Sequence, residues 1–143
     1  MDWPSSLIVG LVVVVVGGVL THNLSSHRDR QTARRNAAAK FRAAFLSALS
    51  GLYPLPTNWP EDINHFLRGV FPALQSAVGE FRPFVAFWRR RAFDRAWFNY
   101  RCGTGREIDL QNYFHYMAFG SNPNAKENFR RNVAALLSFA DRP

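Results

Sequence analysis

The residues of this chain best suited to chemistry are its single cysteine, Cys102, and His115 in the aromatic segment Tyr113–Met117. Together with Asp109 they could form a Cys–His–Asp arrangement, in which the histidine activates the thiol as a nucleophile. Such an arrangement can be drawn for almost any chain that has one cysteine and one histidine. We therefore expect His115 to be an ordinary core or surface residue, and the sequence does not predict an enzyme.

Two short patterns beside Cys102 match phosphate-binding motifs only in part. A phosphatase-like loop needs five residues between its cysteine and its arginine, but only three separate Cys102 from Arg106. Gly103 and Gly105 do not complete a GxGxxG motif, which must follow a strand and open a helix. None of the four histidines has a partner at the spacing typical of a metal site. We therefore predict a loop here, with no cofactor, no metal and no small-molecule substrate.

Residues 82–101 combine arginines with aromatic side chains. Arginine neutralises phosphate charge and aromatic rings stack on exposed bases, so this segment could bind nucleic acid. The same side chains could pack within the domain, pair with Glu61, Asp62 or Glu80, or contact a membrane surface or a partner protein. These interpretations all remain open. The candidate binding residues are Arg82, Trp88, Arg89, Arg90, Arg91, Arg95, Trp97 and Arg101.

Positive charge is concentrated in two regions of the chain, which has 18 basic and 10 acidic residues. Residues 22–50 and residues 81–102 each contain six basic residues and one acid, a net charge of +5. Close to a membrane, each basic residue contributes roughly 1 kcal/mol of attraction to anionic lipid. The first region could therefore bind lipid or nucleic acid, or could only fix the topology of a membrane segment. Its candidate lipid contacts are Arg28, Arg30, Arg34 and Arg35.

Residues 7–20 form an uncharged apolar run with five consecutive valines, and no Asp, Glu, Lys or Arg occurs between Trp3 and Ser26. About 20 residues at roughly 1.5 Å each are enough to cross a hydrocarbon layer of roughly 30 Å as a helix. A secretory signal peptide would need a positively charged start, whereas the charged side chain before the run is Asp2. We therefore predict a retained transmembrane anchor at residues 1–26.

The charges that flank the apolar run predict its orientation. No Lys or Arg precedes the run, whereas six basic residues follow it within residues 22–50, and basic flanks tend to stay in the cytoplasm. We therefore predict a single-pass inner-membrane protein of bacterial type, with its N-terminus outside and a cytoplasmic helical domain at residues 27–143. A reducing cytoplasm agrees with a single cysteine that has no disulfide partner in the chain.

Small residues follow one another along the predicted span at intervals of four, seven and four positions. Such a stripe allows two transmembrane helices to approach closely, although the GxxxG motif itself is absent. The chain could therefore form a homodimer through its span. The residues of this stripe are Ser6, Gly10, Gly17 and Thr21.

Apolar residues recur every three or four positions through most of residues 27–143, which predicts amphipathic helices. The first helix should cover His27–Leu52, because Gly51 and the prolines that follow it end the pattern. Asn58 should cap the second helix, with Glu61 three residues later as in a capping box. Both residues would then stand at the start of a buried apolar stripe.

Prolines should divide the middle of the domain, because a proline cannot donate a backbone hydrogen bond. Pro72 and Pro83 should each interrupt the helical pattern, giving a short helix that ends near Glu80 and a longer one that ends near Arg101. The Asn-Pro pair at positions 122 and 123 should start the last helix. Residues 109–119 could be either helical or extended.

The composition is that of a folded domain. Hydrophobic residues make up 48% of the chain against nine glycines and eight prolines, which excludes a disordered chain, and one cysteine excludes an internal disulfide. The predicted fold is all-α, with one N-terminal transmembrane helix and a small cytoplasmic bundle of four or five helices. The predicted function is that of a membrane-anchored binding or scaffolding protein. The alternative is a membrane-tethered nucleic-acid-binding protein that uses residues 82–101.

Overall fold

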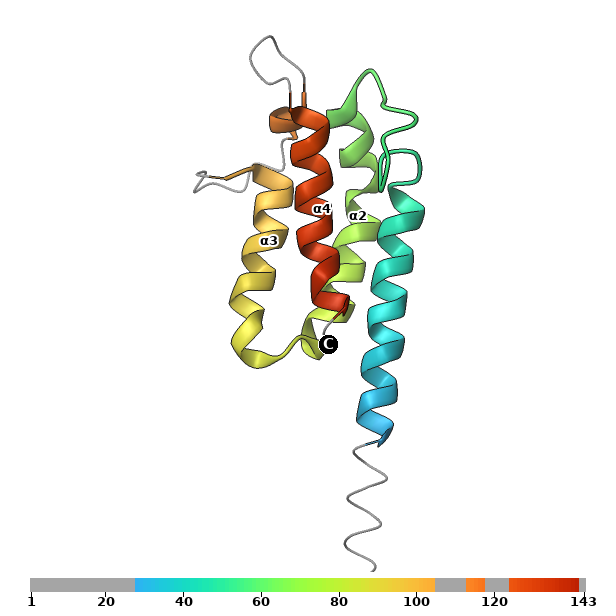
Figure 1. Ribbon diagram of the computed structural model, residues 1–143, viewed down its shortest axis with the longest axis vertical. Coiled ribbons are helices and arrows are strands. Elements are labelled where there is room, and N and C mark those ends of the chain that lie inside the picture. Colours follow the sequence, from blue (N-terminus) through green and yellow to red (C-terminus); the bar gives the residue numbers. More distant parts are fainter. Residues whose placement is uncertain (1–27, 105–112, 118–123, 142–143) are drawn as a thin grey trace, which may run out of the picture. The chain divides into compact units, whose positions relative to one another are not determined.

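The computed structural model describes residues 28–104, 113–117 and 124–141. The regular elements within these ranges are helices (Figure 1), so the predicted all-α class is confirmed for this part of the chain. The α-helices are residues 28–48, α2 (Ile63–Phe81), α3 (Arg90–Cys102) and α4 (Ala125–Asp141). The 3₁₀ turns are η1 (Arg82–Phe84), η2 (Phe87–Arg89) and η3 (Phe114–Tyr116).

The chain divides into two compact units, residues 1–35 and residues 36–143. The predicted anchor at residues 1–26, including its small-residue stripe, lies outside the described residues and stays a prediction. Among the helices that the structure does describe, none is both long enough and apolar enough to cross a membrane. The packing described below is that of the second unit.

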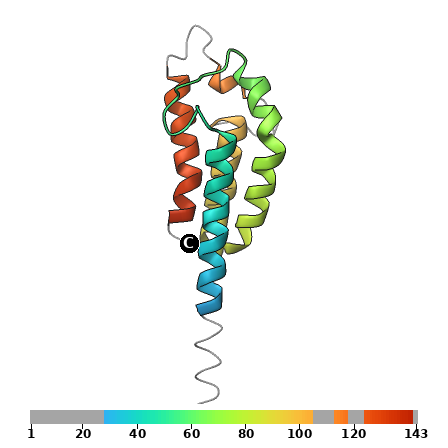
Figure 2. The same cartoon turned by 90° about the vertical axis from the view of Figure 1, so that its right-hand side faces the viewer.

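In the second unit the helix that ends at residue 48, α2, α3 and α4 pack side by side, and consecutive helices run in opposite directions (Figures 1 and 2). Aromatic rings dominate the core between them. Phe93 is fully buried, and its ring centroid lies 5.3 to 5.9 Å from those of Phe41, Phe81 and Phe139. This Phe cluster joins all four helices, and such ring pairs each contribute about 0.5–1.5 kcal/mol beyond their burial.

A second group of rings fills the core near the C-terminal end of α3. The ring centroid of Tyr100 lies 5.9 to 6.1 Å from those of Tyr113, Tyr116 and Phe129. All four side chains are fully buried. These contacts tie η3 and α4 to the end of α3, which is where the pocket described below is formed.

Pro72 does not interrupt a helix, so the predicted break at this position is wrong. α2 continues through Pro72 from Ile63 to Phe81. The proline side is exposed, whereas Leu67, Leu74 and Val78 form one buried stripe that runs past it. Burial of this stripe on both sides of the proline offsets the one backbone hydrogen bond that the proline removes.

The predicted cap of the second helix is also wrong. The cap is Asp62, whose Oδ1 accepts a hydrogen bond from the backbone N–H of His65 at 2.8 Å. The backbone N–H of Asn58 instead donates to the carbonyl of Gly51 at 3.0 Å, which closes the loop after the first helix. That loop includes Gly51 at φ +84°, so the first helix ends at residue 48, before the predicted Leu52.

The helix predicted to start at Pro83 starts at Arg90 instead. After α2 the chain makes η1, passes through extended backbone at Val85 (ψ 132°), and makes η2 before α3 begins. Val85 is only 3% exposed. The extended backbone at Val85 directs its side chain into the core. A continuous helix through Val85 would point this side chain in another direction.

The last helix begins at Ala125. The predicted stripe of Phe129, Val133 and Leu136 is fully buried, which confirms the periodicity. The Asn-Pro pair predicted to start it lies outside the described residues, as do most of residues 109–119. The described part of that ambiguous segment contains the short helical turn η3.

Candidate functional site

The arginines and aromatic residues predicted to form one binding face lie in different environments. Trp97 is only 6% exposed and belongs to the core. Its ring stacks on Phe71 at 6.0 Å and on Tyr100 at 5.5 Å, and its indole N–H donates to Gln75 Oε1 at 3.1 Å. Within residues 82–101 the exposed aromatic residues are Phe87 and Trp88, which are 80% and 81% exposed in η2.

Two of the arginines hold the connection between α2 and α3. Arg82 donates two hydrogen bonds of 2.7 Å to the carboxylate of Asp94. This pairing lowers the pKa of Asp94, chiefly through the hydrogen bond from Arg82. Arg90 donates to the carbonyl oxygens of Val85 and Pro83 at 3.1 and 2.9 Å. Both guanidinium groups therefore stabilise the irregular segment between the two helices.

Two further arginines lie over aromatic rings. The guanidinium carbon of Arg89 lies 4.7 Å from the ring centroid of Phe139, and that of Arg101 lies 5.1 Å from the ring of Trp97. Both contacts fall within the range of cation–π attraction. The acidic partner of Arg82 is Asp94, which the sequence did not single out. Two of the acids considered from the sequence have other roles, because Asp62 caps α2 and Glu80 accepts a hydrogen bond from Ser76.

Arg91 and Arg95 are exposed on α3. Arg91, Arg95 and Phe98 follow one another at intervals of four and three, which places them on one side of α3, and Trp88 lies in η2 just before this helix. Phe98 is half-buried and lines a groove of about 720 Å³ between α2 and α3. The lining of this α2–α3 groove is Phe71, Gln75, Val78, Gly79, Arg82, Asp94, Trp97, Phe98 and Arg101.

The first basic region belongs to the helix at residues 28–48. The side chains of Arg28, Arg30 and Arg35 are exposed, and that of Arg34 is half-buried. Their spacing distributes them around the helix, so they do not form a single stripe.

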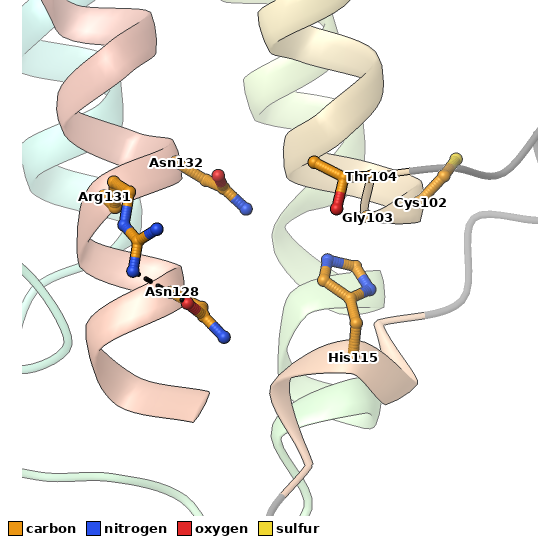
Figure 3. Close-up of a pocket in the computed structure, with 7 residues that line it drawn as sticks. All are labelled: Cys102, Gly103, Thr104, His115, Asn128, Arg131 and Asn132. Carbon is orange, nitrogen blue, oxygen red and sulfur yellow. Dashed lines mark hydrogen bonds between the residues drawn. The ribbon is translucent and has the colours of Figure 1, made fainter. Parts of the chain in front are cut away.

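A second, smaller pocket of about 230 Å³ lies where the C-terminal end of α3, η3 and α4 meet (Figure 3). It brings together Cys102 and His115, the two residues considered for chemistry from the sequence. The remaining lining residues come from the loop after α3 and from one side of α4. They are Gly103, Thr104, Asn128, Arg131 and Asn132.

His115 is held in place by the end of α3. Its Nε2 lies 3.2 Å from the carbonyl oxygen of Tyr100, and the hydroxyl of Tyr116 donates to the same oxygen at 2.9 Å. Because a carbonyl can only accept, Nε2 carries a proton and donates it. Burial raises the pKa of Tyr100 and of Tyr116, so both hydroxyls stay neutral. Two side chains thus satisfy a carbonyl that would otherwise be unpaired at the helix end.

Cys102 contributes to the pocket wall, but its sulfur points away from the imidazole of His115 (Figure 3). The thiol is only 1% exposed. Asp109, the third residue of the conceivable Cys–His–Asp arrangement, lies outside the described residues. Within the described ranges, no three His, Cys, Asp or Glu side chains gather as metal ligands would.

The polar side of α4 was missed in the sequence analysis. Arg131 and Asn132 lie three and four positions after Asn128, a spacing that indicates one helix face. No family model, curated protein or solved structure matches the chain. The fold is that of a small helical-bundle domain that carries the α2–α3 groove and the pocket at the end of α3.

Proposed function

We propose that this protein is a single-pass membrane-anchored adaptor, whose helical domain binds an acidic, amphipathic segment of a partner protein in the α2–α3 groove. The observation that carries this proposal is the groove, whose lining includes Phe71, Trp97 and Phe98, together with the exposed Arg91 and Arg95 on α3. Amphipathic helices dock into such grooves through a few apolar anchors. Complementary charges at the rim then select the partner.

The floor of the groove suits apolar anchors. Phe71 and Trp97 stack on each other in its lining, which also includes Phe98 of α3. On α2, a side chain added at Gly79 would meet nothing within 4 Å, so the groove is open above this glycine. Aromatic residues and arginine are the types that carry most binding energy in protein interfaces.

The charge around the groove suits an acidic partner. Asp94 is the acidic residue of the lining, and Arg82 neutralises it through two hydrogen bonds. Arg91 and Arg95 are exposed on the same helix as Phe98, and Trp88 is exposed in η2 just before α3. A partner segment with carboxylates opposite Arg91 and Arg95 would therefore gain both charge complementarity and a stacking surface.

A flat bilayer cannot fill a concave groove, which favours a protein segment over lipid as the occupant. Nucleic acid is favoured less, because Arg82, Arg89, Arg90 and Arg101 already contact groups within the domain. Two remaining arginines would give only a shallow dependence of binding on salt, with a slope of about −0.9 for each phosphate contact.

The proposed anchor is the predicted span at residues 7–20, with the predicted small-residue stripe as a surface for pairing two copies. The basic residues Arg28, Arg30, Arg34 and Arg35 would follow it at the cytoplasmic face, where anionic lipids attract them. For a protein of this topology, we propose the inner membrane of a bacterium as the location.

We expect the full chain to resist extraction from membranes by alkaline carbonate, and a chain that starts at residue 27 to be released. The domain should still fold after this truncation, because the buried residues that the structure describes begin at Ala38. Cell fractionation followed by circular dichroism of the released chain measures both effects. A truncated chain that remains folded but sediments quantitatively with membranes would contradict the anchor.

We expect a photoreactive residue placed at Trp88 in the full chain to trap a discrete protein in intact cells. Reversing the charges of Arg91 and Arg95 to glutamate should abolish this crosslink, because an acidic partner would then be repelled. The matched control is Arg68→Glu, a charge reversal at an exposed position of α2. It should leave the crosslink unchanged.

Other outcomes of this experiment would replace the proposal. Crosslinks to lipid alone would assign the α3 surface to the membrane, and crosslinks to nucleic acid would support the tethered nucleic-acid-binding protein. A protein crosslink that survives reversal of both arginines would mean that an acidic segment is not what the groove selects.

A further inference from the structure

The pocket at the end of α3 offers hydrogen-bond donors and a positive charge. Arg131 is the charged group of its described lining, and it is exposed at the surface. The acid nearest along α4 is Glu127, whose two carboxylate oxygens each accept a hydrogen bond of 3.0 Å from Arg130. Among the described residues no acid lies within salt-bridge distance of Arg131, although its charge adds to the lowering of the Glu127 pKa, of which the hydrogen bond from Arg130 is the main cause.

Two hydrogen bonds orient the donor groups of this pocket and occupy the acceptor atoms next to them. Arg131 donates through Nη2 to Oδ1 of Asn128 at 3.1 Å, which leaves the amide N–H groups of Asn128 and the remaining guanidinium N–H groups as donors. Asn132 donates through Nδ2 to the hydroxyl of Tyr116 at 2.9 Å, which fixes its orientation at the pocket wall. Figure 3 shows Asn128 and Asn132 extending from α4 toward the side of the pocket that holds Thr104 and His115.

On the opposite wall of the pocket, the backbone of Gly103 packs closely against the imidazole ring of His115. A side chain added at Gly103 would come within 3.3 Å of Cγ of His115, so the loop packs directly against the imidazole. The imidazole ring lies 3.9 Å from that of Tyr116, centroid to centroid. The hydrogen bond of Nε2 to the carbonyl oxygen of Tyr100 and the ring contact with Tyr116 fix the position of His115. His115 therefore does not rotate into the pocket to act as a hydrogen-bond acceptor for Arg131.

The size of the pocket limits the ligand. A volume of about 230 Å³ exceeds that of several water molecules, which occupy about 30 Å³ each in the liquid. It is smaller than the roughly 300–1,000 Å³ of sites that hold drug-sized ligands. The pocket therefore accommodates a small anion or the charged end of a longer molecule.

From these observations we propose that the pocket binds a small oxyanion, a carboxylate or a phosphate, through the guanidinium of Arg131 and the side-chain amide of Asn128. Both the guanidinium and the side-chain amide donate N–H groups to oxygen, and the guanidinium adds the positive charge that strengthens such hydrogen bonds. The site is independent of the α2–α3 groove, since the two linings share no residue. Its test therefore stands apart from that of the adaptor function.

The test titrates the purified full chain in detergent with inorganic phosphate and, separately, with acetate. Binding heat is followed by calorimetry, and the ring signals of the four histidines are followed by NMR. We expect saturable binding of at least one anion, together with a shift of the His115 ring signals. The anion that binds more tightly distinguishes a phosphate site from a carboxylate site.

Arg131→Gln should weaken this binding roughly tenfold or more, the usual effect of losing one charge-assisted hydrogen bond. Arg130→Gln is the matched control, because it removes the same charge one residue away, from a side chain that pairs with Glu127. It should leave anion binding unchanged. Asn128→Ala provides a second variant at the site, and circular dichroism checks that each variant remains folded.

Equal weakening by Arg130→Gln and Arg131→Gln would overturn the proposal, because it would mean that the anion responds only to the overall positive charge. The proposal would also fail if neither anion shifted the His115 signals in a folded protein. Loss in Arg131→Gln and in Asn128→Ala, with retention in Arg130→Gln, would establish the site.

Discussion

Replacing Phe93 with alanine is expected to lower the free energy of unfolding by about 3–5 kcal/mol, the range for truncating a buried phenylalanine. Phe93 is fully buried and contacts rings from the first helix, α2 and α4. Since small domains are stable by only about 5–15 kcal/mol in total, this loss would remove a large fraction of the stability. Urea denaturation followed by circular dichroism measures the effect.

Phe87→Ala is the control for this experiment, because it removes the same ring from a position that is 80% exposed. Its effect should stay within about 0.5 kcal/mol, as is usual for surface substitutions. Comparable losses for the two variants would contradict the core described here. They would mean that η2 is covered in the folded protein and that Phe87 belongs to a packed interface.

Gly103→Ala is expected to destabilise the protein by about 1–3 kcal/mol, the cost of holding a residue other than glycine in this backbone region. Gly103 has φ +78° and ψ 170°, a conformation that side chains with a Cβ rarely adopt. The added methyl group would also press on His115, whose Cγ would lie 3.3 Å from it. The same variant should therefore move the ring signals of His115 in an NMR spectrum.

Gly69→Ala serves as the opposite control. Gly69 lies within α2, and a Cβ at this position meets nothing within 4 Å. Alanine there should raise the free energy of unfolding by about 0.5–1 kcal/mol, because glycine is a poor residue inside a helix. If Gly103→Ala were as stable as the wild type, the loop after α3 would have another conformation in solution. The wall of the oxyanion pocket that Gly103 forms would then differ from the one described here.

The groove and the pocket illustrate what short-range patterns could and could not predict. Periodic apolar residues predicted the stripe of the last helix, and Phe129 and Val133 are indeed fully buried. A different pattern, arginines interleaved with aromatic residues, placed Trp97 among the candidate binding residues with Trp88. One of these rings is buried and the other is 81% exposed, because burial depends on which neighbours the fold supplies.

Local sequence patterns also could not predict which charged residues pair. Arg82 and Asp94 are 12 positions apart and are separated by two 3₁₀ turns, so no helical spacing links them. The pairing exists because extended backbone at Val85 lets the chain reverse between α2 and α3. Of the partners considered from the sequence, Glu61 and Asp62 lie at the other end of α2, and Glu80 accepts a hydrogen bond from Ser76.

The sequence by itself determined the all-α class of the described domain and the buried stripe of its last helix, because helical periodicity is a local property of the chain. Only the tertiary structure decided that α2 continues through Pro72, that Asp62 caps it, and that Arg131 and His115 share a pocket. These outcomes depend on burial and on contacts between distant segments. Core packing can outweigh the local preference of a proline, and it alone selects which polar side chains meet.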